Sequence, residues 1–303
     1  MAIQHEVWAR DLAKNLYPDN SFFAQGRNDD KWVSYKKVHL PQAGPRPEVV
    51  KNRAVFPAVP VNRVDTVSEY DLHEFTSTPT VIRDIEEIET SYDKRADVLS
   101  DHIKEINKQI ANDVSFQWSG PNVIRTTGGD VATGLDGATG NRKGLAIDDF
   151  MNAKTILDDM DVDLSGRCVL LPAAWYNNMV NANRAELLRL ETMGKAGFKD
   201  GEIMMLFGFK IFTRGKKNIL RYTNAATPVK KAFGTANTAT DNASGIFFQK
   251  DFVRRAKGAV KVYADYDKPE YYGSTFSAMA RSGASRAYTD GTGVVTIVEE
   301  AAA

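Results

Sequence analysis

The stretch DIEEIETSYDKRADVLSDHIKEINKQIANDVSFQW, residues 84–118, decides the fold of this chain. Its apolar residues recur at steps of three and four, at Ile88, Tyr92, Ala96, Leu99, Ile103, Ile106, Ile110, Val114 and Trp118. This spacing places them on one face of an α-helix. At about 1.5 Å per residue, the helix would be roughly 50 Å long. We therefore predict a spine helix, which needs an extended sheet to cover its single apolar stripe.

The composition is that of a folded protein with an uneven charge distribution. The chain has 303 residues, of which 43% are hydrophobic and 26% are charged, and this allows one large or two modest domains. The 39 basic and 39 acidic residues balance, yet residues 61–209 are acidic and residues 210–290 are basic. No segment has the basic density typical of a nucleic-acid-binding domain. The asymmetry favours charge-complementary contacts between domains or between copies.

The segments on either side of the spine predict a ribbon and an α/β region. Lys31 to Leu40 and Val61 to Phe75 read as two strands, and five prolines make the segment between them stiff and irregular. Residues 2–17 read as an amphipathic arm with little of its own chain to pack on. A two-stranded ribbon is marginal alone in water, so we expect ribbon and arm to lie on a neighbouring surface.

The second half of the chain alternates between helical and strand patterns. Residues 147–159 predict a helix, Cys168 to Leu171 a buried strand, and the run after Pro172 one further helix. Strand patterns then continue to a last strand at Val294 to Val298. The final residues EEAAA read as an exposed tail.

Two patterns partly resemble a phosphate-binding loop and a calcium-binding loop, but neither has all the required residues. Residues 119–144 are rich in glycine, but Lys143 is followed by glycine instead of the Ser or Thr of a phosphate-binding loop, so we predict a flexible loop. Asp159, Asp161 and Asp163 alternate as in a calcium loop, but leucine occupies the positions where an EF-hand needs Gly and Glu.

The remaining reactive residue types give no catalytic constellation. The four histidines His5, His39, His73 and His102 lie in four different segments without metal-ligand spacing. Cys168 is the only cysteine, which excludes an internal disulfide, and it opens an apolar strand where a buried thiol is the ordinary reading. We therefore expect no catalytic, cofactor-binding or metal-binding residues. No apolar run approaches 18 residues and the N-terminus is polar, so no membrane span or signal peptide is expected.

The order of these parts resembles the major capsid proteins of tailed bacteriophages, the Hong Kong 97-type fold. The most similar run is IDDFMNAKTILDDMDVDLSGRCVLLPAAWYNNMV, residues 147–180, and the closing strands from FFQKDFVRRAKGAVKVYADYDKP onward are similar as well. The resemblance covers essentially the whole chain and implies an α+β fold. It implies an N-terminal arm at 1–27, a β-ribbon called the E-loop at 28–83, a peripheral (P) domain from 84–122 and 245–290, and an axial (A) domain from 123–244 and 291–303.

The resemblance implies a structural function and not an enzymatic one. The expected protein self-assembles as pentamers and hexamers into an icosahedral virion shell in the host bacterial cytoplasm. The shell would enclose double-stranded DNA without sequence-specific binding. The Gly-rich segments 126–144 and 194–201 would be candidates for contacts near the symmetry axes. Some members carry a scaffolding segment of about a hundred residues before the arm, and this sequence has no room for one. Either a separate scaffold protein exists or such a segment is missing. A portal and a possible decoration protein are further expected partners.

Two alternatives and one chemical question stay open. An encapsulin-like nanocompartment shares this fold, and a soluble α/β enzyme with an atypical site is the alternative from a different class. Some family members cross-link a ribbon lysine to a neighbour's asparagine. Lys36, Lys37 and Lys51 are available for such a bond, but the sequence singles out no partner.

Overall fold

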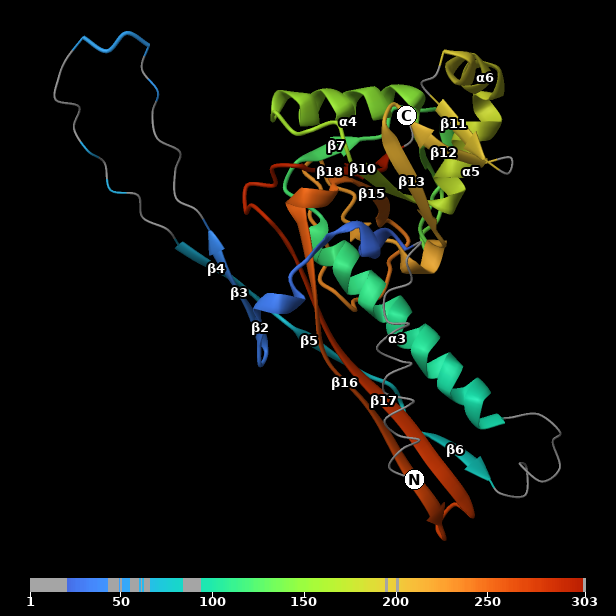
Figure 1. Cartoon of the computed structure of the whole chain (residues 1–303). Coiled ribbons are helices and arrows are strands. Elements are labelled where there is room, and N and C mark those ends of the chain that lie inside the picture. The colour runs from blue at the N-terminus through green and yellow to red at the C-terminus, as the bar shows by residue number, and fades with distance from the viewer. Residues whose placement is uncertain are drawn as a thin grey trace.

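A long helix and two large sheets organise the chain (Figure 1). The computed structural model describes residues 21–42, 49, 51–54, 60, 62, 66–83, 94–193, 196–199 and 202–301. The predicted N-terminal arm, most of the proline-rich tip of the ribbon and the first ten residues of the predicted spine lie outside these ranges. Among the described residues, no helix is long and apolar enough to cross a membrane.

The first sheet has five strands in the order β1-β16-β17-β5, and β6 also pairs with β17. The strands are β1 (Arg27–Asn28), β5 (His73–Thr76), β6 (Thr80–Arg83), β16 (Val253–Lys268) and β17 (Gly273–Arg286). Strands β16 and β17 form one long antiparallel hairpin, which runs beside α3 through the narrow half of the molecule (Figure 1). The hairpin supplies the extended surface that the predicted spine requires.

Helix α3 (Lys94–Trp118) lies along this sheet and packs on β17, as its apolar spacing predicts. Ile106 and Ile110 are buried, and they share one core with Ala278 and Ala280 of β17. Alanine side chains let the helix approach the strand closely, so the apolar stripe is covered in the C-terminal half of the helix. The helix ends before Gly-Pro, as expected from the loss of the backbone donor.

The second sheet has eight strands in the order β11-β12-β13-β10-β15-β18-β7, and β14 also pairs with β15. Its strands are β7 (Val123–Arg125), β10 (Arg167–Pro172), β11 (Ala196–Lys199), β12 (Glu202–Leu206), β13 (Phe209–Arg214), β14 (Arg221–Tyr222), β15 (Asn242–Gln249) and β18 (Val294–Val298). The central strands β10, β15 and β18 are buried throughout. A sheet covered on both faces explains their nearly continuous apolar runs.

The two faces of this sheet belong to two different cores. Val169 and Leu171 of β10 point into a core shared with the helices that follow β9 and β10. Cys168 and Leu170, which alternate with them, point into the core that contains the C-terminal half of α3. Because successive side chains of a strand point to opposite faces, one strand joins both halves of the molecule.

Three helices complete the first of these cores. They are α4 (Ile147–Asp159), α5 (Ala173–Ala182) and α6 (Arg184–Thr192). The predicted bounds of α4 are confirmed, but the prediction of a single helix after Pro172 is wrong. The side chain of Asn183 donates a hydrogen bond to the carbonyl of Met179 at 3.0 Å and ends α5. Asparagine side chains compete in this way with the helical backbone, so two shorter helices form.

Two small sheets correct two further predictions. One contains β2 (Val33–Ser34), β3 (Lys37–Gln42) and β4 (Thr66–Asp71), and the other contains β8 (Asp130–Ala132), β9 (Asn141–Lys143) and β19 (Glu300–Ala301). Residues 31–40 are therefore not one strand, because the chain reverses at Tyr35, whose φ is 52°. The Gly-rich region 119–144 is not simply a flexible loop, because β7, β8 and β9 all lie within it. The 3₁₀ helices are η1 (Phe22–Gln25), η2 (Asp30–Trp32), η3 (Lys216–Asn218) and η4 (Lys250–Phe252).

The prediction of an exposed C-terminal tail is wrong at its first residue. The side chain of Glu299 is fully buried. Its carboxylate accepts hydrogen bonds from the hydroxyl of Thr133, the backbone N–H groups of Gly134 and Ala243, and the indole of Trp175, at 2.6–2.9 Å. These four donors provide the partners that a buried charge needs.

Candidate assembly surfaces

The root of the ribbon is a small packed unit at the edge of the molecule. Strands β3 and β4 pair in register from Lys37 opposite Asp71 to Gln42 opposite Thr66. Val38, Leu40 and Leu72 form a core with Ala256 of β16, which attaches the ribbon to the long hairpin. Figure 1 shows β3 and β4 pointing away from both large sheets. The described part of the ribbon is thus rigid at its base and directed outward.

A buried carboxylate fixes this root to the five-stranded sheet. Asp29 is 1% exposed and lies 3.6 Å from the guanidinium of Arg254. Burial raises the pKa of Asp29, while Arg254 and the hydroxyl of Tyr70 act in the opposite direction. Tyr70 of β4 donates to Asp29 at 3.3 Å. The contact ties the ribbon strand β4 to β16.

The turn of the β16–β17 hairpin presents aromatic side chains to solvent. Tyr272 is 82% exposed and Tyr271 is 47% exposed. Asp265, Asp267 and Glu270 precede them in the sequence. Exposed tyrosines combined with charge are typical of contact surfaces between proteins, because the ring buries area and the hydroxyl finds a polar partner.

The opposite end of the molecule carries a second exposed apolar surface. Leu188 and Met193, in and just after α6, are more than half exposed, and Met205 of β12 is 48% exposed. Helix α6 and strand β12 lie beside β11 at the edge of the eight-stranded sheet (Figure 1). Part of the predicted contact segment 194–201 forms β11, which pairs with β12. Apolar side chains that gather at a protein surface are typical of an interaction site.

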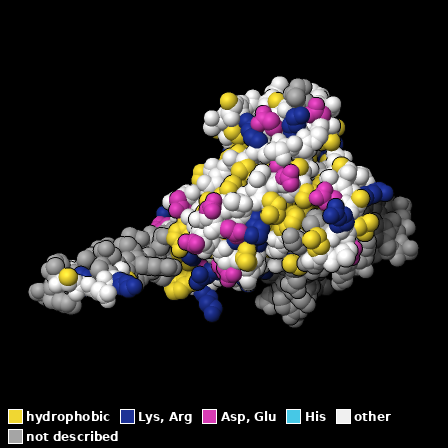
Figure 2. Space-filling model, turned by 90° about the horizontal axis from the view of Figure 1, so that it is seen from above, with side chains coloured by type: hydrophobic (Ala, Val, Ile, Leu, Met, Phe, Trp, Pro, Cys, Tyr) yellow, Lys and Arg dark blue, Asp and Glu magenta, His cyan; other side chains and the backbone are white. Residues whose placement is uncertain are grey.

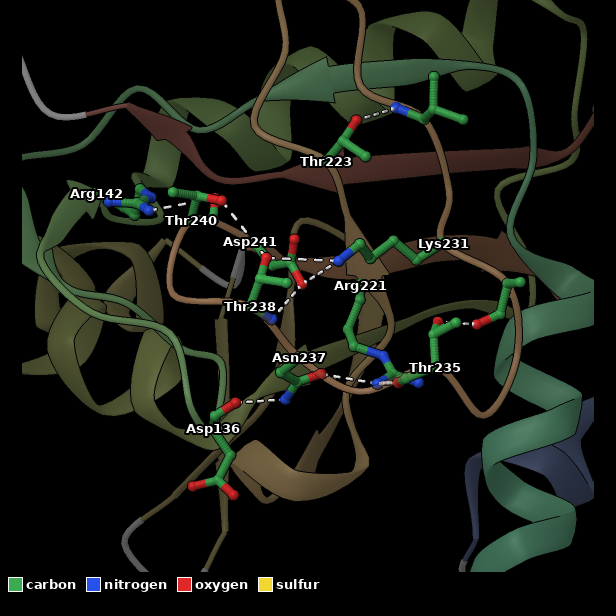
Figure 3. A network of polar contacts seen from close by, with 12 residues as sticks. Asp136, Arg142, Arg221, Thr223, Lys231, Thr235, Asn237, Thr238, Thr240 and Asp241 are labelled. Carbon is green, nitrogen blue, oxygen red and sulfur yellow. Dashed lines mark hydrogen bonds and ion pairs between the residues drawn. The ribbon is translucent and has the colours of Figure 1, made fainter.

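A cavity of about 350 Å³ lies between α3 and the loops around residues 136, 217 and 233. Arg221 closes one wall with hydrogen bonds to the carbonyl of Thr235 and to Oδ1 of Asn237. The amide of Asn237 in turn donates to the carbonyl of Asp136. Lys231 pairs with Asp241 at 2.7 Å, so the segment between β14 and β15 is fixed at several points (Figure 3).

The outer surface alternates in charge. Seen from above, basic and acidic side chains are interspersed, and hydrophobic side chains gather near the middle of the body (Figure 2). Several cations and carboxylates of the exposed face of α3 pair with each other, such as Lys104 with Asp101 at 3.0 Å and Lys108 with Glu105 at 3.1 Å. Exposed pairs of this kind contribute little to stability.

The structure separates the histidines that sequence reasoning singled out. His39 contacts Glu69 in the ribbon at 2.9 Å, and His73 contacts Asp113 of α3 at 2.9 Å. His102 is buried on α3, where burial lowers its pKa. His5 lies outside the described residues. Within the described ranges, no group of three His, Cys, Asp or Glu could hold a metal ion.

The other candidate residues have structural surroundings. Cys168 is 3% exposed, and burial raises the pKa of its thiol to about 11, so the reactive thiolate is disfavoured. Asp163 accepts a hydrogen bond from the backbone of Ser165 at 3.1 Å and so stabilises a turn. Lys143 pairs with Asp130 across β8 and β9 at 2.9 Å.

The three ribbon lysines have different surroundings. Lys37 pairs with Glu69 at 3.0 Å. The carbonyl of Lys36 accepts a hydrogen bond from the backbone of Leu72 at 2.7 Å. Lys51 is exposed.

Sequence reasoning missed a half-buried cation, Lys230, at the junction of the two halves. Lys230 lies 4.0 Å above the ring of Phe116 and donates to the carbonyl of the same residue at 2.9 Å. Burial lowers the pKa of Lys230 to about 8. Arg286 donates to the carbonyls of Gln117 and Ser119 nearby. Both cations thus donate hydrogen bonds to carbonyls at the C-terminal end of α3, where the helix dipole favours positive charge.

Comparisons with solved structures reveal the fold, whereas no protein-family model and no curated protein matches the sequence. The capsid of the cyanophage P-SCSP1u aligns with a TM-score of 0.60 and 17% identity, covering 95% of this chain and 89% of that chain. The capsid of Ralstonia phage GP4 aligns with a TM-score of 0.60 and 10% identity, covering 91% and 87%. A virus-like particle from Pyrococcus furiosus aligns with a TM-score of 0.54 and 9% identity, covering 97% and 99%.

These structural alignments cover most of this chain and most of each matched chain. They confirm the predicted α+β fold of the Hong Kong 97 type and the predicted resemblance to phage major capsid proteins. At such low identity, the likeness concerns the fold.

Proposed function

We propose that this chain is a major capsid protein, a non-enzymatic subunit that self-assembles into an icosahedral shell around phage double-stranded DNA. The observation that carries this proposal is the end-to-end likeness to phage capsid subunits. Its exposed contact surfaces, at the ribbon, at the β16–β17 turn and around α6, support the same conclusion, because they lie on separate parts of the molecule.

Each part has a proposed role in the shell. The ribbon within residues 28–83 is the E-loop that lies on a neighbouring subunit. The spine helix α3 with β16 and β17 is the P-domain. The eight-stranded sheet with α4, α5 and α6 is the A-domain, whose exposed end meets other copies around five- and six-fold axes. Because β15 pairs with β10 and β18, we place the A-domain boundary after Gln249 instead of at residue 244.

The proposed mechanism is the addition of many modest contacts. Each copy engages several neighbours, so a closed shell is stable although each contact is weak. Pentamers and hexamers form in the host cytoplasm, and the finished shell belongs to the virion. A separate scaffold protein, a portal and possibly a decoration protein complete the set of proposed partners. Contact with the enclosed DNA does not depend on its sequence.

Assembly of the purified full chain tests the proposal. We expect sedimentation and negative-stain microscopy to show closed particles of megadalton mass. Tyr272→Asn should reduce particle formation while circular dichroism of the subunit stays unchanged, because asparagine tolerates the positive φ of 49° at this position. The matched control is Leu164→Ser, a change at another exposed apolar residue. A monomer or small oligomer under all conditions, including added scaffold, would instead favour the soluble enzyme.

A cargo-housing nanocompartment is the second candidate. The virus-like particle from Pyrococcus furiosus matches over 99% of its own length, so its subunit has a similar fold. Particles isolated from their source distinguish the two functions. Genomic DNA inside supports the virus, whereas a co-purifying enzyme without DNA supports the compartment.

A further inference from the structure

The longest stretch of one-signed charge in the chain folds against α3. Between Glu202 and Asp241 the sequence has no acidic residue and seven basic ones: Lys210, Arg214, Lys216, Lys217, Arg221, Lys230 and Lys231. This segment contains β13, η3 and β14. It forms one wall of the cavity beside α3. A run of cations is ordinarily a solvated surface, but here several of them converge on one hollow.

The cavity has a polar wall, a basic wall and an aromatic rim. Gln109 and Asn112 of α3 line one side, and Lys217, Arg221 and Lys231 line the other. Its volume of about 350 Å³ lies within the range of small-ligand pockets. This is enough room for one or two side chains of a partner, and too little for a folded element.

The charges of the basic wall are only partly neutralised. Lys231 pairs with Asp241 at 2.7 Å. Arg221 donates to two neutral oxygens, and Lys217 has no hydrogen bond or ion pair within the described part of the chain. Asp136 is the only carboxylate among the lining residues. The cavity therefore carries a net positive charge and favours an anionic group.

The rim adds an apolar contact. Phe233 is 47% exposed, and its ring lies edge-on to Phe116 with centroids 5.8 Å apart. The occupant that fits therefore combines negative charge with an apolar side chain. Lys230 covers Phe116 at 4.0 Å and holds this ring in place.

The shape of the site distinguishes an acidic peptide from a DNA duplex. A rigid duplex cannot enter a hollow of this volume, whereas a carboxylate on a flexible chain can reach its wall. The side chains of a peptide are small enough to avoid this obstacle.

We propose that this cavity is a docking site for an acidic peptide segment of a partner protein. Lys217 and Arg221 bind its carboxylates, and Phe233 packs against its apolar side chain. The site is complete within one subunit, so it does not depend on the proposed shell function.

Fluorescence anisotropy with a labelled short peptide tests this site on the full-length protein. The probe is a run of glutamates with a central phenylalanine, and the comparison peptide has glutamine in place of each glutamate. We expect saturable binding of the acidic probe that weakens with salt, and at least about ten-fold weaker binding of the glutamine peptide. Lys217→Glu should weaken binding by about ten-fold, and Phe233→Ser should weaken it independently of salt.

Lys261→Glu is the matched control, because it makes the same charge change on the exposed face of β16. It should leave the affinity of the acidic probe unchanged. Equal binding of the two peptides, or equal effects of the two charge reversals, would overturn the proposal. Binding of a short DNA duplex that is tighter than the peptide and lost in Lys217→Glu would assign the cavity to nucleic acid instead. Neither result depends on whether particles form, so the outcome is separate from that of the assembly experiment.

Discussion

Glu299 offers the sharpest test of how the C-terminus stabilises the eight-stranded half. One carboxylate oxygen accepts from Gly134 at 2.6 Å and from the indole of Trp175 at 2.8 Å. The other accepts from the hydroxyl of Thr133 at 2.7 Å and from the backbone of Ala243 at 2.9 Å. The group thus connects the end of β18 to a loop, to α5 and to β15. All four bonds are made without contact with solvent.

Glu299→Gln preserves the volume of this side chain and removes half of its accepting capacity. The amide nitrogen must face two of the four donors, whichever way the amide is oriented. The better orientation places it beside Thr133, whose hydroxyl can rotate and accept. The backbone N–H of Ala243 then faces another donor and stays unsatisfied. Hydrogen bonds to charged groups contribute about 1.5–3 kcal/mol each, so we expect a loss of about 2–4 kcal/mol in unfolding free energy. This is a large part of the typical stability of a domain.

Urea unfolding of the unassembled subunit, followed by circular dichroism, measures this loss. Glu300→Gln is the control at the adjacent residue, where the carboxylate lies 3.2 Å from Arg125 and is 43% exposed. Exposed pairs contribute less than about 1 kcal/mol, so the control should stay close to the parent protein. If the two variants lose equal stability, Glu299 is not the connection that its four hydrogen bonds indicate.

Two further substitutions test the spine and its C-terminal end. Ile106→Asp should lower the unfolding free energy by about 4 kcal/mol or more and prevent soluble folding, because it buries a charge without a partner. The control Lys104→Asp, on the exposed face of the helix, should fold. Recovery of folded Ile106→Asp would contradict the proposed core role of α3. Burial lowers the pKa of Lys230 to about 8 from the ordinary 10.5, so the unfolded state binds more protons between these values and stability should rise with pH there. Relative to Lys230→Met, which lacks this titration, the gain should be about 1 kcal/mol after solvent screening, and parallel stability curves for the two proteins would refute it.

The spine and the buried strands could be predicted because their signals are local. Ile103, Ile106 and Ile110 repeat with the period of a helix, and Cys168 to Leu171 form an uninterrupted apolar run. Each pattern needs only neighbouring residues to be recognised. The resemblance to capsid proteins then supplied the arrangement of the parts, which periodicity alone does not determine.

The features that sequence reasoning missed depend on distant residues. Glu299 looks like part of a charged tail, because its donors come from residues 133, 134, 175 and 243. Strand β9 was not predicted in the glycine-rich region, because its partner β19 lies at the other end of the chain. The basic character of residues 210–290 was visible in the sequence, but its convergence beside α3 was not. Long-range pairing of this kind leaves no periodic signal.

One side chain, Trp118, contacts both halves of the molecule at their junction. Trp118 is fully buried at the end of α3, and its indole donates to the carbonyl of Arg254 in β16 at 2.9 Å. Its ring also packs on Phe248 of β15 with centroids 5.1 Å apart, and on Phe22 at 6.0 Å. A Cβ atom on Gly26 would lie 2.6 Å from this ring, so no larger residue fits there. Rotating one sheet relative to the other would have to break these contacts together. These contacts therefore join the two sheets directly, whereas the ribbon is attached through its separate small core.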